Sequence, residues 1–208
     1  TIDTTTVIRA RTLVLEMLPG DLFFSTYFIN EGSNLATLSL IMNPETLWDE
    51  DIGLYQNQYK QREIPVAIQS FSPELNHEFS ISAGLRLGGE NIWTKAQKPF
   101  TIYTRNRFGA DYLQYQIFEN KSISNFSRVV FRNGGDDWEE ALLRDAMTES
   151  IVSDRMACGI MAYRPARLFL NGSYWGIYNI REKFDKTYFV ENFNVDLNYL
   201  IHLEYATT

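Results

Sequence analysis

Sulfur and imidazole side chains are scarce in this sequence, which has one cysteine and two histidines among its 208 residues. A single cysteine, Cys158, excludes an internal disulfide and a cysteine-rich metal site. With only His77 and His202 available, the sequence also argues against a histidine-based metal centre and a Ser-His-Asp triad. Cys158 stands among apolar neighbours, so we expect it to be a small buried hydrophobic residue.

Long apolar runs and an excess of positive charge are missing as well. No stretch of about 18 or more apolar residues occurs, so the sequence predicts no membrane span. The formal net charge is −7. A nucleic acid or an anionic membrane would repel such a chain at long range, so neither is an expected partner.

Aromatic residues are plentiful, at 14% of the sequence, and favour a β-rich domain because flat rings pack well on pleated sheets. Residues 7–15 and 22–29 are typical of two strands, with a turn at residues 19–21. A two-stranded hairpin is marginal alone. We therefore interpret residues 1–30 as the end of an upstream domain and residues 31–208 as a second domain. The opening strands resemble the end of a chitobiase-type β-sandwich, which implies that the upstream domain is such a sandwich.

The second domain has the pattern of an α+β fold. Asn171-Gly172 suits a tight hairpin turn because both residues accept positive φ. A long helix is predicted from Asp136-Asp137 to about Met156, because acids favour a helix start and apolar residues recur every four positions at Leu143, Met147 and Ile151. A short helix is expected at 185–192, capped by Asp185, and a last strand at 200–203. Further strands are predicted at 35–42, 64–70, 78–87, 99–104, 128–132, 166–170 and 175–180.

Several motifs, taken together and in order, resemble those of the spore coat protein H (CotH) kinase family. The resemblance covers roughly residues 35 to 205. Where the family usually has Ser-Arg after two glycines, this chain has Asn91-Ile92. The motifs are Gly84-Leu85-Arg86-Leu87-Gly88-Gly89, Gln97-Lys98-Pro99-Phe100-Thr101-Ile102-Tyr103, Arg132-Asn133-Gly134-Gly135-Asp136-Asp137-Trp138, Leu142-Leu143-Arg144-Asp145-Ala146, and the run from Arg164-Pro165 through Asn171-Gly172 to Arg181-Glu182-Lys183-Phe184-Asp185.

The resemblance implies an atypical protein-kinase-like N-lobe, mostly antiparallel sheet with one long helix. It implies a secreted or cell-surface enzyme that transfers phosphate from ATP to serine of surface or coat proteins, with Mg²⁺. Phosphoryl transfer depends on positioning and charge neutralisation. The resemblance places the catalytic and metal-binding aspartates beyond Thr208, so the 208-residue chain is expected to have little transfer activity, with its own catalytic residues unknown and no metal ligand assigned.

Within this chain the resemblance indicates residues that bind the nucleotide. Lys98, at the start of a strand, is expected to reach the α and β phosphates. Gly88 and Gly89 let backbone N–H groups approach phosphate because no side chain blocks them. Glu149 is predicted to face inward, where a carboxylate needs a cationic partner, and is assigned to Lys98.

Two further residues join the predicted nucleotide site, each with an alternative. Arg86 contacts phosphate or anchors carboxylates and carbonyls of the fold. Glu182 lies where a kinase hinge would be and is predicted to bind ribose or adenine. Asp185 beside it is interpreted as a helix cap rather than a catalytic base.

Two other function classes remain open at this stage. A carbohydrate-associated binding module on the same scaffold would use exposed rings for stacking, although most rings in β-rich proteins are core. A glycoside hydrolase would need two carboxylates across a cleft, and no such pair stands out, so this class ranks last. The ring candidates for sugar stacking are Trp48, Trp93, Trp138 and Trp175.

Overall fold

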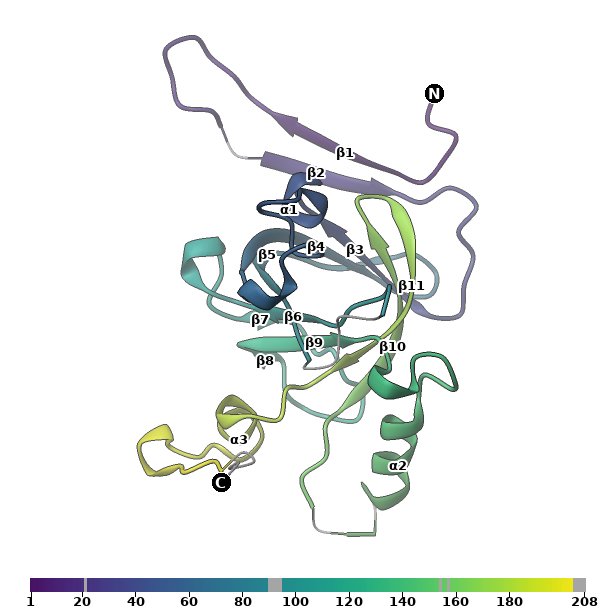
Figure 1. Ribbon diagram of the computed structural model, residues 1–208, viewed down its shortest axis with the longest axis vertical. Coiled ribbons are helices and arrows are strands. Elements are labelled where there is room, and N and C mark those ends of the chain that lie inside the picture. The colour runs from purple at the N-terminus through teal and green to yellow at the C-terminus, as the bar shows by residue number, and fades with distance from the viewer. Residues whose placement is uncertain (21, 90–94, 154, 157, 204–208) are drawn as a thin grey trace.

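The structure is a computed structural model that describes residues 1–20, 22–89, 95–153, 155–156 and 158–203 (Figure 1). It is an α+β fold of mostly antiparallel strands with few helices. Its helices and 3₁₀ turns are α1 (Glu45–Trp48), η1 (Gln58–Lys60), η2 (Asn106–Phe108), η3 (Gly135–Asp137), α2 (Arg144–Ser153), α3 (Lys186–Phe193) and η4 (Leu197–Tyr199). Its strands are β1 (Thr6–Arg11), β2 (Leu22–Tyr27), β3 (Ala36–Ile41), β4 (Ile64–Phe71), β5 (His77–Leu87), β6 (Phe100–Tyr103), β7 (Leu113–Gln114), β8 (Asn125–Phe126), β9 (Arg128–Arg132), β10 (Tyr163–Leu170) and β11 (Ser173–Arg181).

Seven strands close into a barrel in the order β10-β11-β9-β6-β5-β4-β3. Every neighbouring pair is antiparallel except β3 and β10, which run parallel with Ala36 opposite Ala166 and Leu40 opposite Leu170. This one parallel pair joins the first and last parts of the barrel. Closure leaves the barrel without an unpaired outer strand.

Strand β3 is buried on both faces, and its sequence alternates accordingly. Leu38 and Leu40 are fully buried in the hydrophobic core. Between them, the Ser39 hydroxyl forms a hydrogen bond with the Thr26 hydroxyl at 2.8 Å. Successive side chains of a strand point to opposite faces, so the leucines fill the barrel while the hydroxyl side meets the N-terminal segment.

The N-terminal hairpin of β1 and β2 forms its own two-stranded sheet, as the sequence predicts, and it is anchored on the barrel. The backbone N–H and the hydroxyl of Thr26 both donate to the Gln69 side chain at 2.9 Å. The ring of Phe28 packs edge-on against Phe71 and Phe169, with centroids 5.1 and 5.2 Å apart. The hairpin therefore packs on the outside of the barrel; the assignment of residues 1–30 to a separate upstream domain stays a prediction.

The strands of the second domain begin and end close to where the sequence places them. Strands β3, β4, β5, β6, β9, β10 and β11 correspond to the seven predicted strands, and β10 and β11 form the predicted hairpin. At its turn Asn171 has φ 50° and Gly172 φ 87°. These left-handed angles are the ones for which an Asn-Gly pair is suited, so this prediction is confirmed.

The long helix predicted from Asp136 is wrong at its start. Residues 135–137 form a separate 3₁₀ turn, and α2 begins only at Arg144. Leu142 has φ 63°, a left-handed conformation that a continuous helix cannot contain. The Asp137 carboxylate accepts hydrogen bonds from the backbone N–H groups of Ala141 and Arg144. Asp137 therefore binds the first N–H group of a helix that begins seven residues after it.

The apolar stripe on this helix does not face the core. Leu143, Met147 and Ile151 are all exposed, and Ala146 is the buried residue of α2.

Two other predictions are also wrong. Cys158 is exposed, because it lies in an irregular segment between α2 and β10 rather than in packed structure, and residues 200–203 form no strand. The cap assigned to Asp185 is confirmed: its carboxylate accepts from the Thr187 N–H at the start of α3.

In the part of the chain that the structure describes, no helix has both the length and the apolar character needed to cross a bilayer.

The anchored hairpin gives a testable stability prediction. Phe28→Ala should lower the free energy of unfolding by about 2 kcal/mol, because it removes a ring packed between two barrel phenylalanines. Phe23→Ala removes an exposed ring of the same hairpin and should change it by less than about 0.5 kcal/mol. Urea unfolding of both variants measures the difference; equal values would show that the hairpin does not stabilise the barrel.

Candidate nucleotide-binding site

The side chain of Lys98 is buried just before β6. Only 5% of the residue is exposed. Its ammonium Nζ donates to the Lys95 carbonyl at 3.0 Å and lies 5.4 Å from the centre of the Tyr55 ring. Burial lowers the pKa of Lys98 from its ordinary value, because the charged form loses solvation. Lysine is seldom buried to this degree without an electrostatic reason.

The segment before β6 is held in place by Gln97, a residue to which sequence reasoning gave no role. The Gln97 side chain donates to the Trp175 carbonyl at 2.5 Å and accepts from the Trp138 indole N–H at 2.7 Å. Its backbone carbonyl accepts from the Asn133 side chain at 2.6 Å. Gln97 therefore joins the segment that carries Lys98 to both β11 and the η3 turn.

Gly176 is the sequence signal that points to Gln97. Gly176 lies inside β11 with φ 125°, and a Cβ atom there would come within 1.6 Å of the Gln97 amide. A glycine within a strand often marks such a close approach. The segment that carries Lys98 therefore packs against a glycine of β11 that is almost 80 residues away in the sequence.

Two tyrosines fix the backbone and the ring beside Lys98. The buried Tyr178 hydroxyl donates to the Lys98 carbonyl at 3.0 Å. Tyr55, whose ring faces the ammonium, accepts from the Trp175 indole N–H at 3.1 Å. Burial raises the pKa of both phenols, so both hydroxyls stay neutral over the ordinary pH range.

The two predicted phosphate-loop glycines each have a packing or backbone reason in the fold. A Cβ at Gly88 would lie 2.9 Å from the Thr101 hydroxyl, and the Gly88 N–H already donates to the Pro99 carbonyl. Gly89 has φ 84°, which favours glycine. Residues 90–94, which follow them in the sequence and include Asn91-Ile92 and Trp93, lie outside the described residues. The Arg86 guanidinium donates to the Gln61 side chain, which suits the structural alternative for this arginine.

Glu149 lies on α2 and binds a different cation from the one predicted. Its carboxylate accepts from Arg181 at 2.7 Å and from the Met161 N–H at 2.7 Å. The described contacts of Lys98 do not include Glu149. The sequence does not reveal Arg181 as the partner of Glu149. Arg181 is the last residue of β11, and no sequence pattern links it to α2, which begins 37 residues earlier. The inward direction predicted for Glu149 and its need for a cationic partner are nevertheless met.

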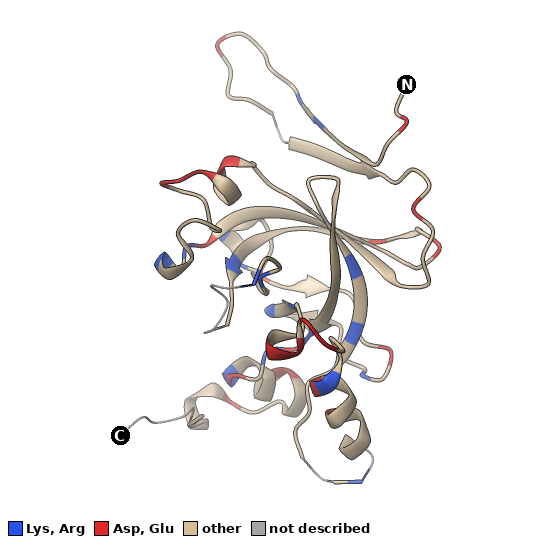
Figure 2. Cartoon of the chain, turned by 45° about the vertical axis from the view of Figure 1, so that its right-hand side comes forward, with Lys and Arg blue, Asp and Glu red and all other residues tan. Residues whose placement is uncertain are grey.

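Arg181 holds α2 on the barrel through two carboxylates one helical turn apart. It is only 1% exposed, and its guanidinium lies 3.3 Å from Asp145 as well as 2.7 Å from Glu149. Arg132 of β9 lies 2.7 Å from the same Asp145 carboxylate oxygen. Figure 2 shows that basic and acidic positions are interleaved around η3 and α2. Because the apolar face of α2 is exposed, these ion pairs position the helix.

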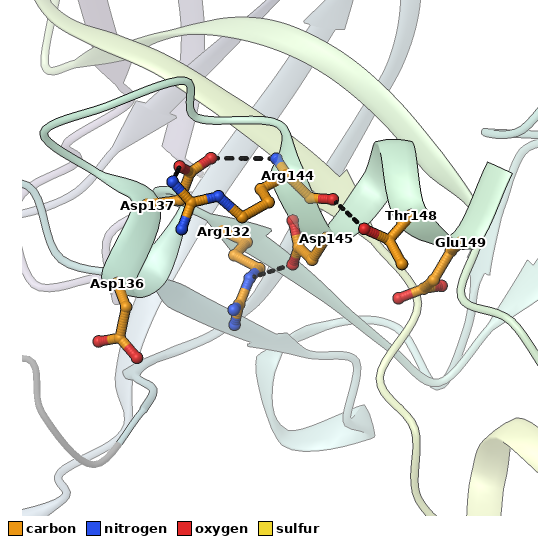
Figure 3. Close-up of a pocket in the computed structure, with 8 residues that line it drawn as sticks. Arg132, Asp136, Asp137, Arg144, Asp145, Thr148 and Glu149 are labelled. Atoms are coloured by element: carbon orange, nitrogen blue, oxygen red, sulfur yellow. Dashed lines mark hydrogen bonds and ion pairs between the residues drawn. The ribbon is translucent and has the colours of Figure 1, made fainter. Parts of the chain in front are cut away.

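A pocket of about 410 Å³ opens between η3 and α2 (Figure 3). Arg132 and Arg144 reach into it, and both are paired with carboxylates, Arg132 with Asp145 and Arg144 with Asp137. The pKa of Asp137 is lowered from its ordinary value. The main causes are the hydrogen bonds that its carboxylate accepts from the backbone N–H groups of Arg144 and Ala141, together with the nearby charge of Arg144. The full lining is Arg132, Gly134, Asp136, Asp137, Arg144, Asp145, Thr148 and Glu149.

Glu182, predicted to bind ribose or adenine, is committed to internal contacts. It is 3% exposed, and one carboxylate oxygen accepts from the Lys121 ammonium at 2.5 Å and the Ala162 N–H at 2.7 Å. The other oxygen accepts from the Asn192 side chain at 2.7 Å. These contacts join α3 to the end of the barrel and suit a structural role. A nucleotide role for Glu182 stays a prediction.

Among the described residues, Lys98 has the charge that suits a phosphate group. Its desolvated ammonium is suited to attract phosphate oxygens. Within the described ranges, no group of three or more His, Cys, Asp or Glu side chains is placed to hold a metal.

Replacing Arg181 tests the electrostatic anchoring of α2. Arg181→Ala should lower the free energy of unfolding by about 3 kcal/mol, because it leaves two carboxylates without their buried partner. Arg144→Ala removes a largely exposed arginine that also pairs with two carboxylates, and should cost less than about 1 kcal/mol. Urea unfolding measures both, and amide exchange in 144–153 should accelerate in Arg181→Ala. A similar small loss in both variants would contradict the anchoring role.

Comparison with known proteins bears on the same part of the chain. No curated protein matches the sequence. A family model described as CotH kinase protein matches residues 85–207, which is more than half of the chain and spans Lys98, α2 and the β10–β11 hairpin. The chain therefore belongs to the CotH kinase family.

Proposed function

We propose that this chain forms the nucleotide-binding part of an atypical protein kinase that transfers phosphate from ATP to serine of surface or coat proteins outside the cell. The observation that carries the proposal is the buried ammonium of Lys98, in a segment whose next residue, Pro99, accepts a hydrogen bond from the Gly88 N–H. A cation with few water contacts attracts phosphate more strongly than an exposed one. The family match supports kinase chemistry with ATP and Mg²⁺.

In this proposal the residues of the chain position the nucleotide. Lys98 contacts the α and β phosphates, and the Gln97 contacts hold the segment before β6 at the required place. Such preorganisation matters because phosphoryl transfer is catalysed mainly by positioning and charge stabilisation. When bound, Mg²⁺ would neutralise phosphate charge; we assign no ligand for it, and no general base, among the described residues.

A second candidate function, carbohydrate binding, rests on one specific feature. Trp48, Tyr55 and Trp175 form a ring cluster with centroids 4.6 to 5.9 Å apart, and Trp48 is 40% exposed. Exposed rings of this kind suit the apolar face of a sugar. Trp138 instead donates to Gln97, so it has an internal role.

Ligand-induced thermal stabilisation distinguishes the two functions. ATP or AMP with Mg²⁺ should raise the melting temperature of the chain, and Lys98→Ala should abolish the rise. Lys60→Ala is the matched control, because Lys60 also lies over a tyrosine ring but on the surface, and it should retain the full effect. Stabilisation by oligosaccharide but not by nucleotide, lost in Trp48→Ala, would overturn the kinase proposal in favour of the second candidate.

The lowered pKa of Lys98 predicts how nucleotide affinity depends on pH. As the pH rises through this lowered pKa, the ammonium loses its charge earlier than an exposed lysine would, so ATP affinity should fall in the alkaline range. Lys98→Arg keeps its charge there and should give a flat profile. Titrations above pH about 8, where the terminal phosphate stays ionised, isolate this effect. Parallel profiles for the two proteins would contradict contact between Lys98 and phosphate.

A further inference from the structure

The loop that joins β1 to β2 is strongly apolar and strongly exposed. Leu15 and Leu18 are 90% and 93% exposed, and Leu13, Val14 and Met17 are exposed as well. We call residues 12–20 the hairpin tip. Its shape is defined by backbone hydrogen bonds from Met17 to Val14 and from Gly20 to Thr12. Exposed apolar clusters of this kind mark interaction sites or aggregation liabilities.

The tip cannot bury these side chains on its own barrel while the hairpin stays anchored. Thr26 and Phe28 bind the base of the hairpin to the barrel wall, through Gln69 and through the rings of Phe71 and Phe169. Figure 1 shows the connecting loop extending beyond the barrel, away from α2 and α3. The tip is therefore presented outward by a fixed base, which reduces the ordering cost of binding a partner.

The same chain carries an apolar groove between this hairpin and the barrel wall. Its volume is about 390 Å³. Arg9 and Arg107 also line it, so an apolar interior is combined with positive charge. No residue of the tip is among those that line it. The apolar lining includes Leu22, Phe24, Ile41, Met42, Val66 and Phe108.

We propose that the hairpin tip docks into this groove of a second copy of the chain, with both copies exchanging tips about a two-fold axis. Apolar side chains of the tip match the groove, and Glu16 of the tip matches Arg9 beside the groove. Figure 2 shows an acidic position at the end of the loop and basic positions on β1, the strand of the hairpin farther from the barrel. In a two-fold pair each such contact occurs twice.

A lipid surface is a poorer occupant for the same tip. Glu16 lies in the middle of the apolar run, between Leu15 and Met17, and a carboxylate is costly to bring into the acyl region. The net charge of −7 further disfavours anionic headgroups. The groove offers apolar side chains to the leucines of the tip and arginines to the carboxylate of Glu16. The charge pattern therefore favours a second copy of the chain over a lipid surface.

Sedimentation velocity over a wide range of protein concentration tests the proposal. The unmodified chain should show a reversible monomer–dimer equilibrium. Leu18→Ser at the tip and Ser82→Trp in the groove, where Ser82 is exposed, should each raise the dimer Kd at least about tenfold. Glu16→Arg should weaken the dimer, and adding Arg9→Glu to it should restore affinity, because the charge pair is reversed rather than lost.

Ile201→Ser is the matched control, since it removes an apolar side chain that is 83% exposed at the other end of the molecule and should leave the Kd unchanged. A chain that stays monomeric at every concentration would overturn the proposal. So would a dimer that is sensitive to Leu18→Ser but not to Ser82→Trp, because the tip would then bind elsewhere. Cosedimentation of the monomer with phosphatidylcholine vesicles, lost in Leu18→Ser, would identify lipid as the occupant instead.

Discussion

The parallel pairing of β3 with β10 is the constraint on which the rest of the structure depends. It joins segments about 130 residues apart in the sequence, and its register of Ala36 with Ala166 leaves little freedom in the remaining five strands. Strands β11 and β6 both pair with β9, and the Gln97 side chain just before β6 meets the β11 backbone at Gly176. This contact holds the segment that carries the buried Lys98. Pairings between strands distant in the sequence therefore shape the surroundings of the proposed site.

The barrel and helix α2 are stabilised by different forces. The barrel interior is filled with aliphatic and aromatic side chains, whereas α2 contributes one buried alanine and is held by Arg181 and Arg132 through Asp145 and Glu149. Salt weakens ion pairs by screening their charges, whereas screening does not weaken apolar burial. The helix can consequently loosen under conditions that leave the barrel intact. The pocket beside η3 is lined by α2 on one side and by residues of β9 and η3 on the other. The α2 side of this pocket is therefore the less rigid side.

Most of the strand layout followed from sequence pattern, and the reasons are local. The segment that became β9 begins and ends where predicted, and Asn171-Gly172 makes the expected turn because its φ angles are a property of those two residues. The start of α2 was misjudged because the left-handed Leu142 is imposed by contacts of Asp137, which no period of apolar residues reveals. Sequence spacing is limited in a similar way for Leu143, Met147 and Ile151. Their spacing correctly indicates a helix, but it does not show whether another part of the protein packs on the helix face that they form, and all three are exposed.

The predicted site residues differ in how far local sequence determines their surroundings. Burial of Lys98 is consistent with the role assigned to it, whereas the partner of Glu149 depends on how β11 meets α2 in three dimensions. Gln97 had a usable signal in Gly176, because a glycine inside a strand points to a close neighbour. Identifying that neighbour required the register of the barrel.

The exposed position of Cys158 has a practical consequence. It is the only thiol in the sequence, and it lies between the end of α2 and the start of β10. A maleimide-linked fluorophore or spin probe would therefore attach at a single defined place without prior removal of other cysteines. From there its signal would report whether the helix shifts relative to the barrel when a nucleotide is added.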